Sequence, residues 1–398
     1  MKQLISLQQN KLLGIVLTIL VLFSCMPFFL IGGGSTLINL SVFIVYLLLF
    51  FIYVAGNGMI LRFNRTEVFC SVVLFVFLYF PFRRYDQLVA SVIWPLIFLS
   101  ILFLDKRILF KVIYYFSDII FYISFGAVLV YILLLIGINL PSYDYSTGLE
   151  GTIKSTYTLY PFTAKLLGQD YSIFGRTMFR ISGIFSEPGH FGIIISMVLY
   201  LNNVLLSNFK RVILIVAAVL TFSMGTYVLL CGLLLIKYGM SRKVFIVFIP
   251  ILSLAFFTYL ILPQEILERF ILNKIGSNSS DVLNERTSAD FTLFYDNYNR
   301  ANFNLVGAGR LVFEKFQLSN SDYRGFFLKF GFLGLVLLVF WFAFINRNRS
   351  KIPFLLTAFL FLVVFLHRAW LVDYLIFYFI IYMIPISYKG LPEINKHN

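Results

Sequence analysis

The stretch LLGIVLTILVLFSCMPFFLI, residues 12–31, decides the fold class, because it is 20 residues long and contains no charged residue. A helix of about 20 apolar residues spans the hydrocarbon core of a bilayer, which is roughly 30 Å thick. The run is too long for the apolar part of a signal peptide, and no small-residue cleavage site follows it. We therefore interpret it as an uncleaved first transmembrane span.

Similar apolar runs recur along the 398-residue chain, which is 60% hydrophobic and only 13% charged. This composition is typical of membrane proteins. The segments 211–222 and 226–239 are short, and form either two spans in a thinned bilayer or one kinked helix. The sequence predicts an all-α polytopic membrane protein with about twelve transmembrane helices. The candidate spans are 12–31, 37–55, 67–81, 88–104, 110–137, 190–206, 211–222, 226–239, 243–262, 325–345, 352–366 and 373–388.

The net charge of +14 follows the positive-inside rule. With both termini in the cytoplasm, the excess of basic residues falls in the short turns on that side. Because these residues are scattered over separate turns, the pI near 9.6 does not indicate a nucleic-acid partner. The three cysteines have no paired spacing, which predicts neither a disulfide framework nor a zinc site.

Two non-cytoplasmic loops are much longer than the others and are expected to carry function. The first, 138–189, is rich in Tyr, Ser, Thr and Gly, which suits a hydroxyl-rich ligand. The second, 263–324, contains a predicted amphipathic helix at 263–275 and the sequence VGAGRLVFEK at 306–315.

The first loop ends in FRISGIFSEPGHFG, residues 179–192. Ser186 or Glu187 is the predicted N-cap of the following helix. The N–H groups at a helix start favour anions, so Arg180 and Arg176 upstream predict an anion site at the membrane surface. Glu187 or His190 could take a proton there. Alternatively, Arg180 pairs with Glu187 and only fixes the loop.

The second loop ends in a comparable way. A Gly307/Gly309 turn precedes Arg310, and Asp322 and Arg324 follow at the start of the next span. Both long loops thus bring arginines to the same membrane level. Basic residues beside helix ends also reach toward lipid headgroups, which is the interpretation that we favour for Lys329.

Two tight outer turns carry charge as well. One contains His367, Arg368 and Asp373, and the other spans residues 83–86 with the sequence RRYD. Charges near apolar helix ends point to function unless they are paired, and a local Arg–Asp pair would satisfy each turn. Asp118, at the cytoplasmic end of its span, is expected to be solvated.

Motifs for metal or nucleotide chemistry are absent from the sequence. We find no DxD, HExxH, GxSxG, Walker or Rossmann pattern. If a diphosphate is the leaving group, arginines would therefore stabilise its charge without a metal or cofactor.

The segment RISGIFSEPGHFG, residues 180–192, resembles the R-x-x-G-x-F-x-x-P element of the O-antigen ligase and polymerase superfamily. The later GAGR (307–310), SDY (321–323) and GFLGLV (331–336) are similar to its second loop and following helix. The overall layout looks most like that of Wzy-type O-antigen polymerases.

This resemblance implies a GT-C-like fold with two large periplasmic loops. It also implies transfer of a growing glycan from undecaprenyl diphosphate to the terminal sugar of an incoming undecaprenyl-diphosphate-linked repeat unit. The product would be O-antigen or a related surface polysaccharide, made without metal or cofactor. The implied partners are undecaprenyl-diphosphate-linked oligosaccharides, membrane lipids and a chain-length regulator protein, and no nucleic acid.

By motif, Arg180 corresponds to the family's diphosphate-contacting arginine. The further diphosphate ligands that we predict are Arg176, Arg310, Arg324 and Arg368, with Arg286 and Arg300 as other loop arginines. The candidates for activating the acceptor hydroxyl are Glu187, His190, Asp322 and His367.

The chain departs from the family pattern at two places. Residues 320–323 (NSDY) replace the His-Asn pair of ligases, which favours a polymerase, and Ser223-Met224-Gly225 lacks the arginine common in the mid-chain turn. The alternative functions are an O-antigen ligase and a lipid-linked oligosaccharide flippase. A flippase would place ionisable groups near the bilayer midplane, whereas here they gather at the outer rim.

Overall fold

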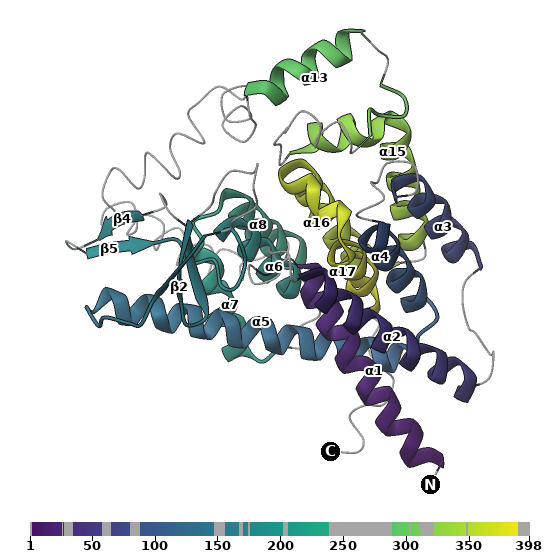
Figure 1. Ribbon diagram of the computed structural model, residues 1–398, viewed down its shortest axis with the longest axis horizontal. Coiled ribbons are helices and arrows are strands. Elements are labelled where there is room, and N and C mark those ends of the chain that lie inside the picture. Colours follow the sequence, from purple (N-terminus) through teal and green to yellow (C-terminus); the bar gives the residue numbers. More distant parts are fainter. Residues whose placement is uncertain are drawn as a thin grey trace.

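The computed structural model describes a mostly helical chain with a small group of strands at one side (Figure 1). The described residues are 2–25, 27, 35–57, 65–79, 88–146, 156–166, 170–173, 176–201, 206–238, 289–301, 304–309, 322–347 and 349–388.

Eleven of the twelve predicted spans coincide with helices, which confirms them as helical segments. The predicted span 243–262 and the predicted amphipathic helix 263–275 lie outside the described residues. The helices are α1 (Lys2–Ser24), α2 (Ser35–Asn57), α3 (Arg65–Tyr79), α4 (Leu88–Ile101), α5 (Lys106–Leu135), α6 (Pro188–Tyr200), α7 (Asn208–Leu220), α8 (Met224–Tyr238), α13 (Ala289–Ala301), α15 (Tyr323–Asn346), α16 (Lys351–Arg368), the 3-10 helix η5 (Ala369–Asp373) and α17 (Leu375–Tyr388).

Three of these helical segments are long and apolar enough to cross a membrane, namely Lys106–Leu135, Tyr323–Asn346 and Lys351–Asp373. Several shorter apolar helices accompany them. Large apolar side chains such as Phe51, Phe69 and Phe340 are exposed on outer helix faces. Because extended apolar faces are not stable in water, this pattern indicates a membrane protein.

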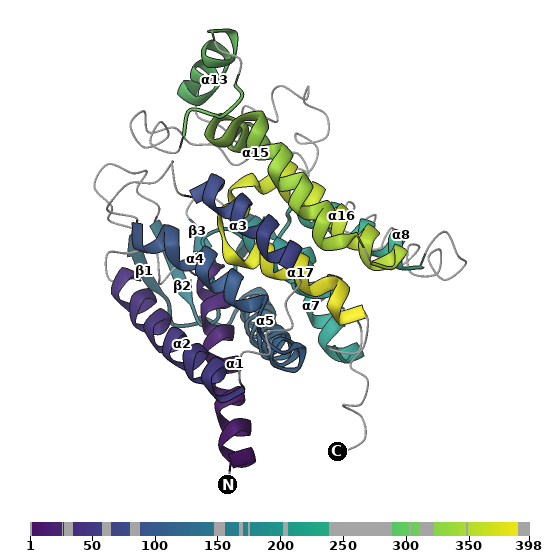
Figure 2. The ribbon, with the colours of Figure 1, turned by 90° about the vertical axis from the view of Figure 1, so that its right-hand side faces the viewer.

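Two helices form the centre of the molecule. Helix α6 is buried along its whole length, and α17 is buried from Leu375 to Ser387. Helix α6 packs against α7 and α8, whereas α17 packs against α1, α4 and α16; Figure 2 shows α16 and α17 side by side. A helix that is apolar all round belongs in a protein interior, and these two fit that rule.

The short segments after α6 form two separate helices rather than one kinked helix. Helix α7 ends before a tight turn at residues 221–223, and α8 begins at Met224. In this turn Phe222 has a φ of 44°, a left-handed conformation that a non-glycine residue adopts only when its surroundings hold it there.

The first long loop contains β-structure, which corrects the all-α prediction. Strands β1 (Tyr143–Ser146), β2 (Thr156–Tyr160) and β3 (Thr163–Leu166) form an antiparallel sheet in that order, with Tyr145 opposite Tyr157. A second hairpin pairs β4 (Asp170–Ile173) with β5 (Arg176–Phe179). The Thr and Tyr residues that suggested a hydroxyl-binding surface also favour strands, since they pack well on a pleated surface.

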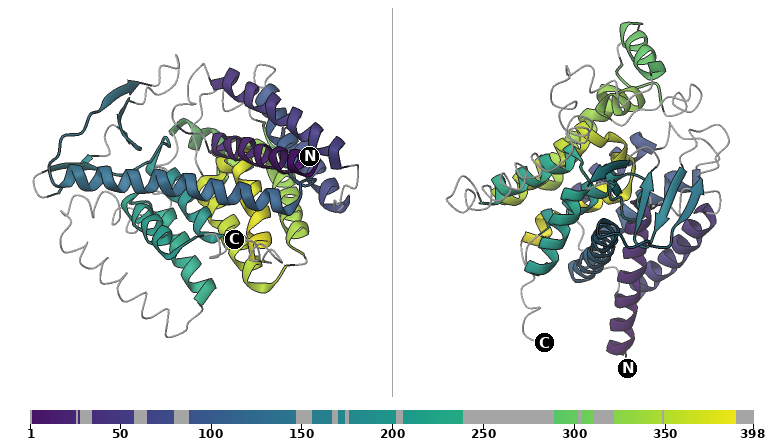
Figure 3. Two further views of the ribbon diagram at one scale, coloured as in Figure 1. Left: turned by 90° about the horizontal axis from the view of Figure 1, so that it is seen from below. Right: turned by 90° about the vertical axis from the view of Figure 1, so that its left-hand side faces the viewer.

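The sheet is attached to the segment that precedes α6. Strand β3 contacts α5, and the Ala164 N–H donates to the Gly183 carbonyl at 2.9 Å. The strands lie beside the C-terminal half of α5, which runs along one side of the molecule (Figure 3). The first loop therefore positions the start of α6.

Helix α15 is broken at Gly331, whose φ of 63° and ψ of −166° are not helical. Residues 304–309 lie across the break, where the Ala308 N–H donates to the Leu328 carbonyl at 2.7 Å and the Phe332 N–H donates to the Asn304 carbonyl at 2.9 Å. A Cβ on Gly331 would lie 2.5 Å from the Leu305 carbonyl oxygen, so only glycine fits. Residues 323–330 thus form a separate half-helix.

Candidate functional site

Residues from both long loops and from the last outer turn meet around η5. Glu187 and His190 come from the start of α6, and Arg368 ends α16. The Trp370 ring of η5 lies 4.8 Å from the His190 ring, centroid to centroid. Trp370 also lines a cleft with Asp322, at the end of the second loop. We define the arginine cluster as Arg180, Glu187, His190 and Arg368, and the aspartate cluster as Asp322, Arg324, Lys329 and Asp373.

An ion pair at the start of α6 organises the arginine cluster. Glu187 Oε2 lies 2.6 Å from Arg368 Nη1. Glu187 is the N-cap of α6, as one of the two predicted alternatives had it, but its carboxylate makes no capping hydrogen bond. The Arg368 guanidinium holds the pKa of Glu187 below its ordinary value, with smaller contributions from His190 and Arg180.

The observed ion pairs differ from the alternatives that the sequence left open, which were a pair between Arg180 and Glu187 and a local pair between Arg368 and Asp373. Instead, Glu187 pairs with Arg368, and Asp373 Oδ2 lies 3.4 Å from Lys329 Nζ. Lys329 therefore faces a carboxylate, which also corrects the prediction that it reaches toward lipid headgroups.

Arg368 lies directly against the first turn of α6. A Cβ on Gly189 would be 2.7 Å from Arg368 Nη2 and 3.3 Å from Ser223 Oγ. Only a residue without a side chain therefore allows the guanidinium to reach this helix start. The adjacent His367 packs on α8 in the same way, because a Cβ on Gly225 would be 3.3 Å from its Cγ.

Arg180 is buried and bound to the α7–α8 turn. Its Nε donates to the Thr221 carbonyl at 2.8 Å, and its Nη2 donates to the Phe222 carbonyl at 3.0 Å. Carbonyls at a helix C-terminus carry partial negative charge, which explains why a cation sits there. Arg180 thus holds the turn in its left-handed conformation while remaining close enough to Glu187 to lower its pKa.

His190 is fully buried between aromatic rings. Its ring lies 5.3 Å from Phe185 and 4.8 Å from Trp370, centroid to centroid. Within the described part of the chain, neither ring nitrogen has a hydrogen-bond partner. An unsatisfied buried polar group costs free energy, and such groups concentrate at functional sites.

Several helices start around this region. Helix α6 starts beside Arg368, α8 starts beside His367, and α17 follows η5 directly. Helix α15 starts after Asp322, which lines the cleft with Trp370. Each helix start carries a partial positive charge, so the end of the molecule that bears the arginine cluster favours anions.

The aspartate cluster contains a local ion pair. Asp322 caps α15 by accepting from the Arg324 N–H at 2.8 Å, and its Oδ2 lies 2.9 Å from Arg324 Nη2. Arg324 Nε also donates to both carboxylate oxygens, at 3.3 and 3.1 Å. Asp322 is almost fully buried, at 1% exposure, which this set of hydrogen bonds explains.

Other predicted site residues have different outcomes. Arg310, Arg286 and the turn at 83–86 lie outside the described residues. Arg176 opens strand β5 and is paired with Ile173 in the ladder, and Arg300 lies in α13. Asp118 is not simply solvated, because its Oδ1 lies 2.5 Å from Lys210 Nζ. Among the described residues, no three His, Cys, Asp or Glu side chains gather as metal ligands would.

The sequence interpretation did not assign Trp370 or Lys329 to the site. Trp370 joins the two clusters, and Lys329 pairs with Asp373. A signal for Trp370 was its place between Arg368 and Asp373, in an outer turn whose charged residues were already candidates.

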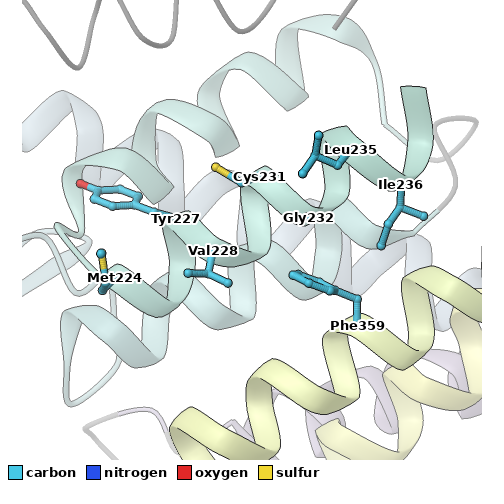
Figure 4. Close-up of a pocket in the computed structure, with 8 residues that line it drawn as sticks. All are labelled: Met224, Tyr227, Val228, Cys231, Gly232, Leu235, Ile236 and Phe359. Atoms are coloured by element: carbon cyan, nitrogen blue, oxygen red, sulfur yellow. The ribbon is translucent and has the colours of Figure 1, made fainter. Parts of the chain in front are cut away.

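An apolar groove lies along α8 (Figure 4). It begins at Met224, directly after Ser223, follows α8 to Ile236 and is bounded by Phe359 of α16. Its volume is about 430 Å³ and its lining is almost entirely apolar. The groove has the chemistry to hold a hydrocarbon chain whose polar end lies at the start of α8.

No protein-family model, curated protein or solved structure matches the chain. A proposal for its function therefore depends on the geometry of the two clusters and on the sequence resemblance.

Proposed function

We propose that the protein is a glycosyltransferase that polymerises lipid-linked oligosaccharide repeat units. It would transfer the growing glycan from undecaprenyl diphosphate to the terminal sugar of an incoming undecaprenyl-diphosphate-linked repeat unit. One observation carries this proposal: Arg368 lies on the start of α6 and already binds an anion, the Glu187 carboxylate, at 2.6 Å. A diphosphate has the charge and oxygen geometry to replace that carboxylate.

The reaction would use the arginine cluster as follows. An acceptor hydroxyl oxygen attacks the anomeric carbon of the donor glycan. The bond from this carbon to the diphosphate oxygen breaks, and the electron pair leaves with the diphosphate. Arg368, Arg180 and the start of α6 stabilise the developing charge. Glu187, once released from Arg368, or His190 takes the hydroxyl proton.

The apolar groove along α8 supports a lipid-linked substrate. A polyprenyl chain lying in it would place its diphosphate near Ser223 and Gly225, close to His367 and Arg368. This arrangement suits a donor whose polar head reacts at the membrane surface while its tail stays in lipid.

The proposal includes a location and a topology. We propose a GT-C-like protein with about twelve spans in a bacterial inner membrane, cytoplasmic termini and both long loops in the periplasm. A chain-length regulator protein is the proposed protein partner. The reaction would proceed without a metal ion, with arginines and helix starts taking its electrostatic role.

Deleting the gene and separating the surface polysaccharide on a gel tests the function. We expect lipid A core that carries one repeat unit. Bare core would indicate a ligase, and repeat units retained in the cytoplasmic leaflet would indicate a flippase. A purified assay with synthetic lipid-linked repeat units and a chelator then tests direct polymerisation, and absence of polymer in it would contradict the proposal.

A further inference from the structure

The three-stranded sheet of the first loop has one polar and one apolar face. Residues that are paired across neighbouring strands share a face. The polar face carries Asp144, Thr158 and Lys165, and the Thr158 hydroxyl donates to the Asp144 carboxylate at 2.8 Å. The apolar face carries Tyr143, Tyr145, Tyr157, Leu159, Ala164 and Leu166. Ala164 is fully buried, whereas Tyr143 on the edge strand is 69% exposed, so this face extends beyond the part that is covered.

The β2–β3 hairpin packs on α5 through its tip residue, Phe162. A Cβ on Gly126 would lie 2.7 Å from Phe162 Cδ2, so only glycine at this position lets the ring pack on the helix. Phe162 has a φ of 63°, a left-handed conformation that is unfavourable for a bulky residue and that this packing holds in place. The residue is nevertheless 55% exposed. One part of the ring therefore contacts α5, and the rest faces outward.

The same part of α5 bears a stripe of exposed apolar side chains. They recur at every third or fourth position, which is the spacing of one helix face, and they are Tyr122, Phe125, Leu129, Ile132 and Ile136. The stripe runs along the segment that is long and apolar enough to cross a membrane. Residues three and four positions apart are neighbours on a helix surface, so Tyr122 and Leu129 lie on either side of Gly126, where Phe162 packs. The exposed part of Phe162 therefore continues this apolar stripe.

The length of α5 places the hairpin tip at a membrane boundary. The helix has 30 residues and extends about 45 Å, which exceeds the roughly 30 Å of bilayer hydrocarbon. Gly126 lies about 30 Å along the helix from Lys106. With the charged Lys106 at one boundary of the hydrocarbon, Gly126 and Phe162 lie at the opposite boundary. An apolar helix longer than the hydrocarbon tilts, and a tilt of α5 would bring Phe162 deeper into the lipid.

The surface around the tip suits lipid better than a polar ligand. Residues 119–136 contain no charged side chain, so this part of α5 cannot pair with a charged partner. The side chains that could bind hydroxyls or charges lie on the opposite face of the sheet. Aromatic rings are favourable at the boundary between hydrocarbon and headgroups, which is where Tyr143 and Phe162 lie.

We propose that the β2–β3 hairpin is a membrane anchor, whose tip lies in the interfacial layer of the leaflet opposite Lys106. Phe162 and Tyr143 contact lipid there, and the polar face of the sheet contacts water. The Ala164 N–H donates to the Gly183 carbonyl at 2.9 Å, so the anchor holds the start of α6 at a fixed depth. An anchor of this kind would serve any reaction at the start of α6, and it does not depend on the proposed function.

The test measures the depth of the hairpin tip in the full-length protein, reconstituted in nanodiscs of phosphatidylethanolamine and phosphatidylglycerol. The three native cysteines are replaced by alanine, and a nitroxide label is attached at Pro161→Cys, beside an intact Phe162. Oxygen is enriched in lipid, whereas a nickel chelate stays in water. We expect the label at position 161 to collide with oxygen more often than with the chelate. A label at Asp144→Cys, on the polar face of the same sheet, is the matched control and should show the opposite order.

Phe162→Asn then tests the ring itself. Asparagine adopts a left-handed φ more readily than phenylalanine, so the variant should keep the turn and lose only the ring. We expect oxygen collisions at position 161 to fall to the level of the Asp144 label, and circular dichroism checks that the variant is folded. Unchanged oxygen collisions in the folded variant would overturn the role of Phe162. If the variant does not fold, the two labels beside an intact Phe162 still decide the proposal.

Two results for the label at position 161 would overturn the anchor. The first is a label that collides with the nickel chelate as often as the Asp144 label does, because the tip would then lie in water. The second is a label that is shielded from both oxygen and the chelate, because another protein or a second copy of the chain would then cover the tip instead of lipid.

Discussion

The arginine cluster and the aspartate cluster both adjoin Trp370, which packs on His190 and lines a cleft with Asp322, but they are built differently. In the arginine cluster, Glu187 pairs with a residue near the end of the chain, and its side chain is 43% exposed. In the aspartate cluster, Asp322 pairs with Arg324 two residues away and is almost fully buried. The first cluster therefore holds an anion that solvent and ligands can reach, whereas the second holds one that is enclosed. This difference favours ligand exchange at Arg368 and a positioning role for Asp322.

Among the variants that compare the two clusters, Arg180→Ala should lower the activity most. The change removes a cation from the arginine cluster and leaves the Thr221 and Phe222 carbonyls without two donors. We expect polymerisation to fall about 10²- to 10³-fold. The measurement is polymer length on a gel at native expression, with activity of the purified protein beside it. Arg180→Lys keeps the positive charge but not the planar guanidinium, so its activity should lie between those of the wild type and the alanine variant. Normal polymer length in the alanine variant would remove Arg180 from the mechanism.

Substituting Gly189 by alanine should have the next largest effect and lower the activity about tenfold. The new Cβ would lie 2.7 Å from Arg368 Nη2 and would move the guanidinium away from the start of α6. Gly14→Ala is the matched control. A Cβ there meets nothing nearer than 3.9 Å, so activity and stability should be retained. If the two variants polymerise at the same rate, the position of Arg368 against the start of α6 is not required for activity.

Asp322→Asn tests whether the aspartate cluster has only a positioning role. The amide keeps an oxygen for the Arg324 N–H but leaves the buried Arg324 guanidinium without its counter-ion, so we expect a stability loss of about 3 kcal/mol and little change in turnover per folded molecule. Thermal unfolding in detergent and the rate per folded protein measure the two effects. A loss of turnover as large as that of the Arg180 variant would mean that the two clusters do not differ in role.

Acid should weaken the arginine cluster by a small amount. Arg368 lowers the pKa of Glu187 below its ordinary 4.5, so the stabilisation by this pair is complete above that value. It is lost as pH falls through the lowered pKa. The difference in thermal unfolding between the wild type and Glu187→Gln should therefore begin to shrink below about pH 4.5 and disappear below the lowered pKa. The effect is small because the ion pair is partly exposed to solvent. A difference in unfolding temperature between the two proteins that stays constant at every pH would contradict a stabilising Glu187–Arg368 pair.

The sequence predicted the features that depend on neighbouring residues. Apolar runs located the described apolar helices because such runs are continuous in sequence, and Pro188 and Glu187 indicated where α6 begins. The polar helix α13 was not predicted. The capping of α15 by Asp322 also depends on neighbouring residues, but it was not predicted. The resemblance to a polymerase family selected Arg180, and the predicted helix start selected Glu187 and His190. Whether these residues act on a diphosphate stays a prediction.

Features that depend on distant residues were missed or mispredicted. Local spacing favoured a pair between Arg368 and Asp373. Instead, Arg368 pairs with Glu187 at the start of α6, and Asp373 pairs with Lys329 of α15. The role of Arg180 at the α7–α8 turn could not be read from residues 176–192, because its acceptors lie some 40 positions later. The strands of the first loop were overlooked because their Thr and Tyr residues were interpreted only as ligand-binding groups.

The long separation between Glu187 and Arg368 has a consequence for biogenesis. While the ribosome is still making α16, the first loop has emerged without the guanidinium that pairs with Glu187. Under the proposed function, a nascent or truncated chain that ends before Arg368 therefore lacks this cation for a lipid diphosphate. Almost the entire protein has to be translated before the Glu187–Arg368 pair can form.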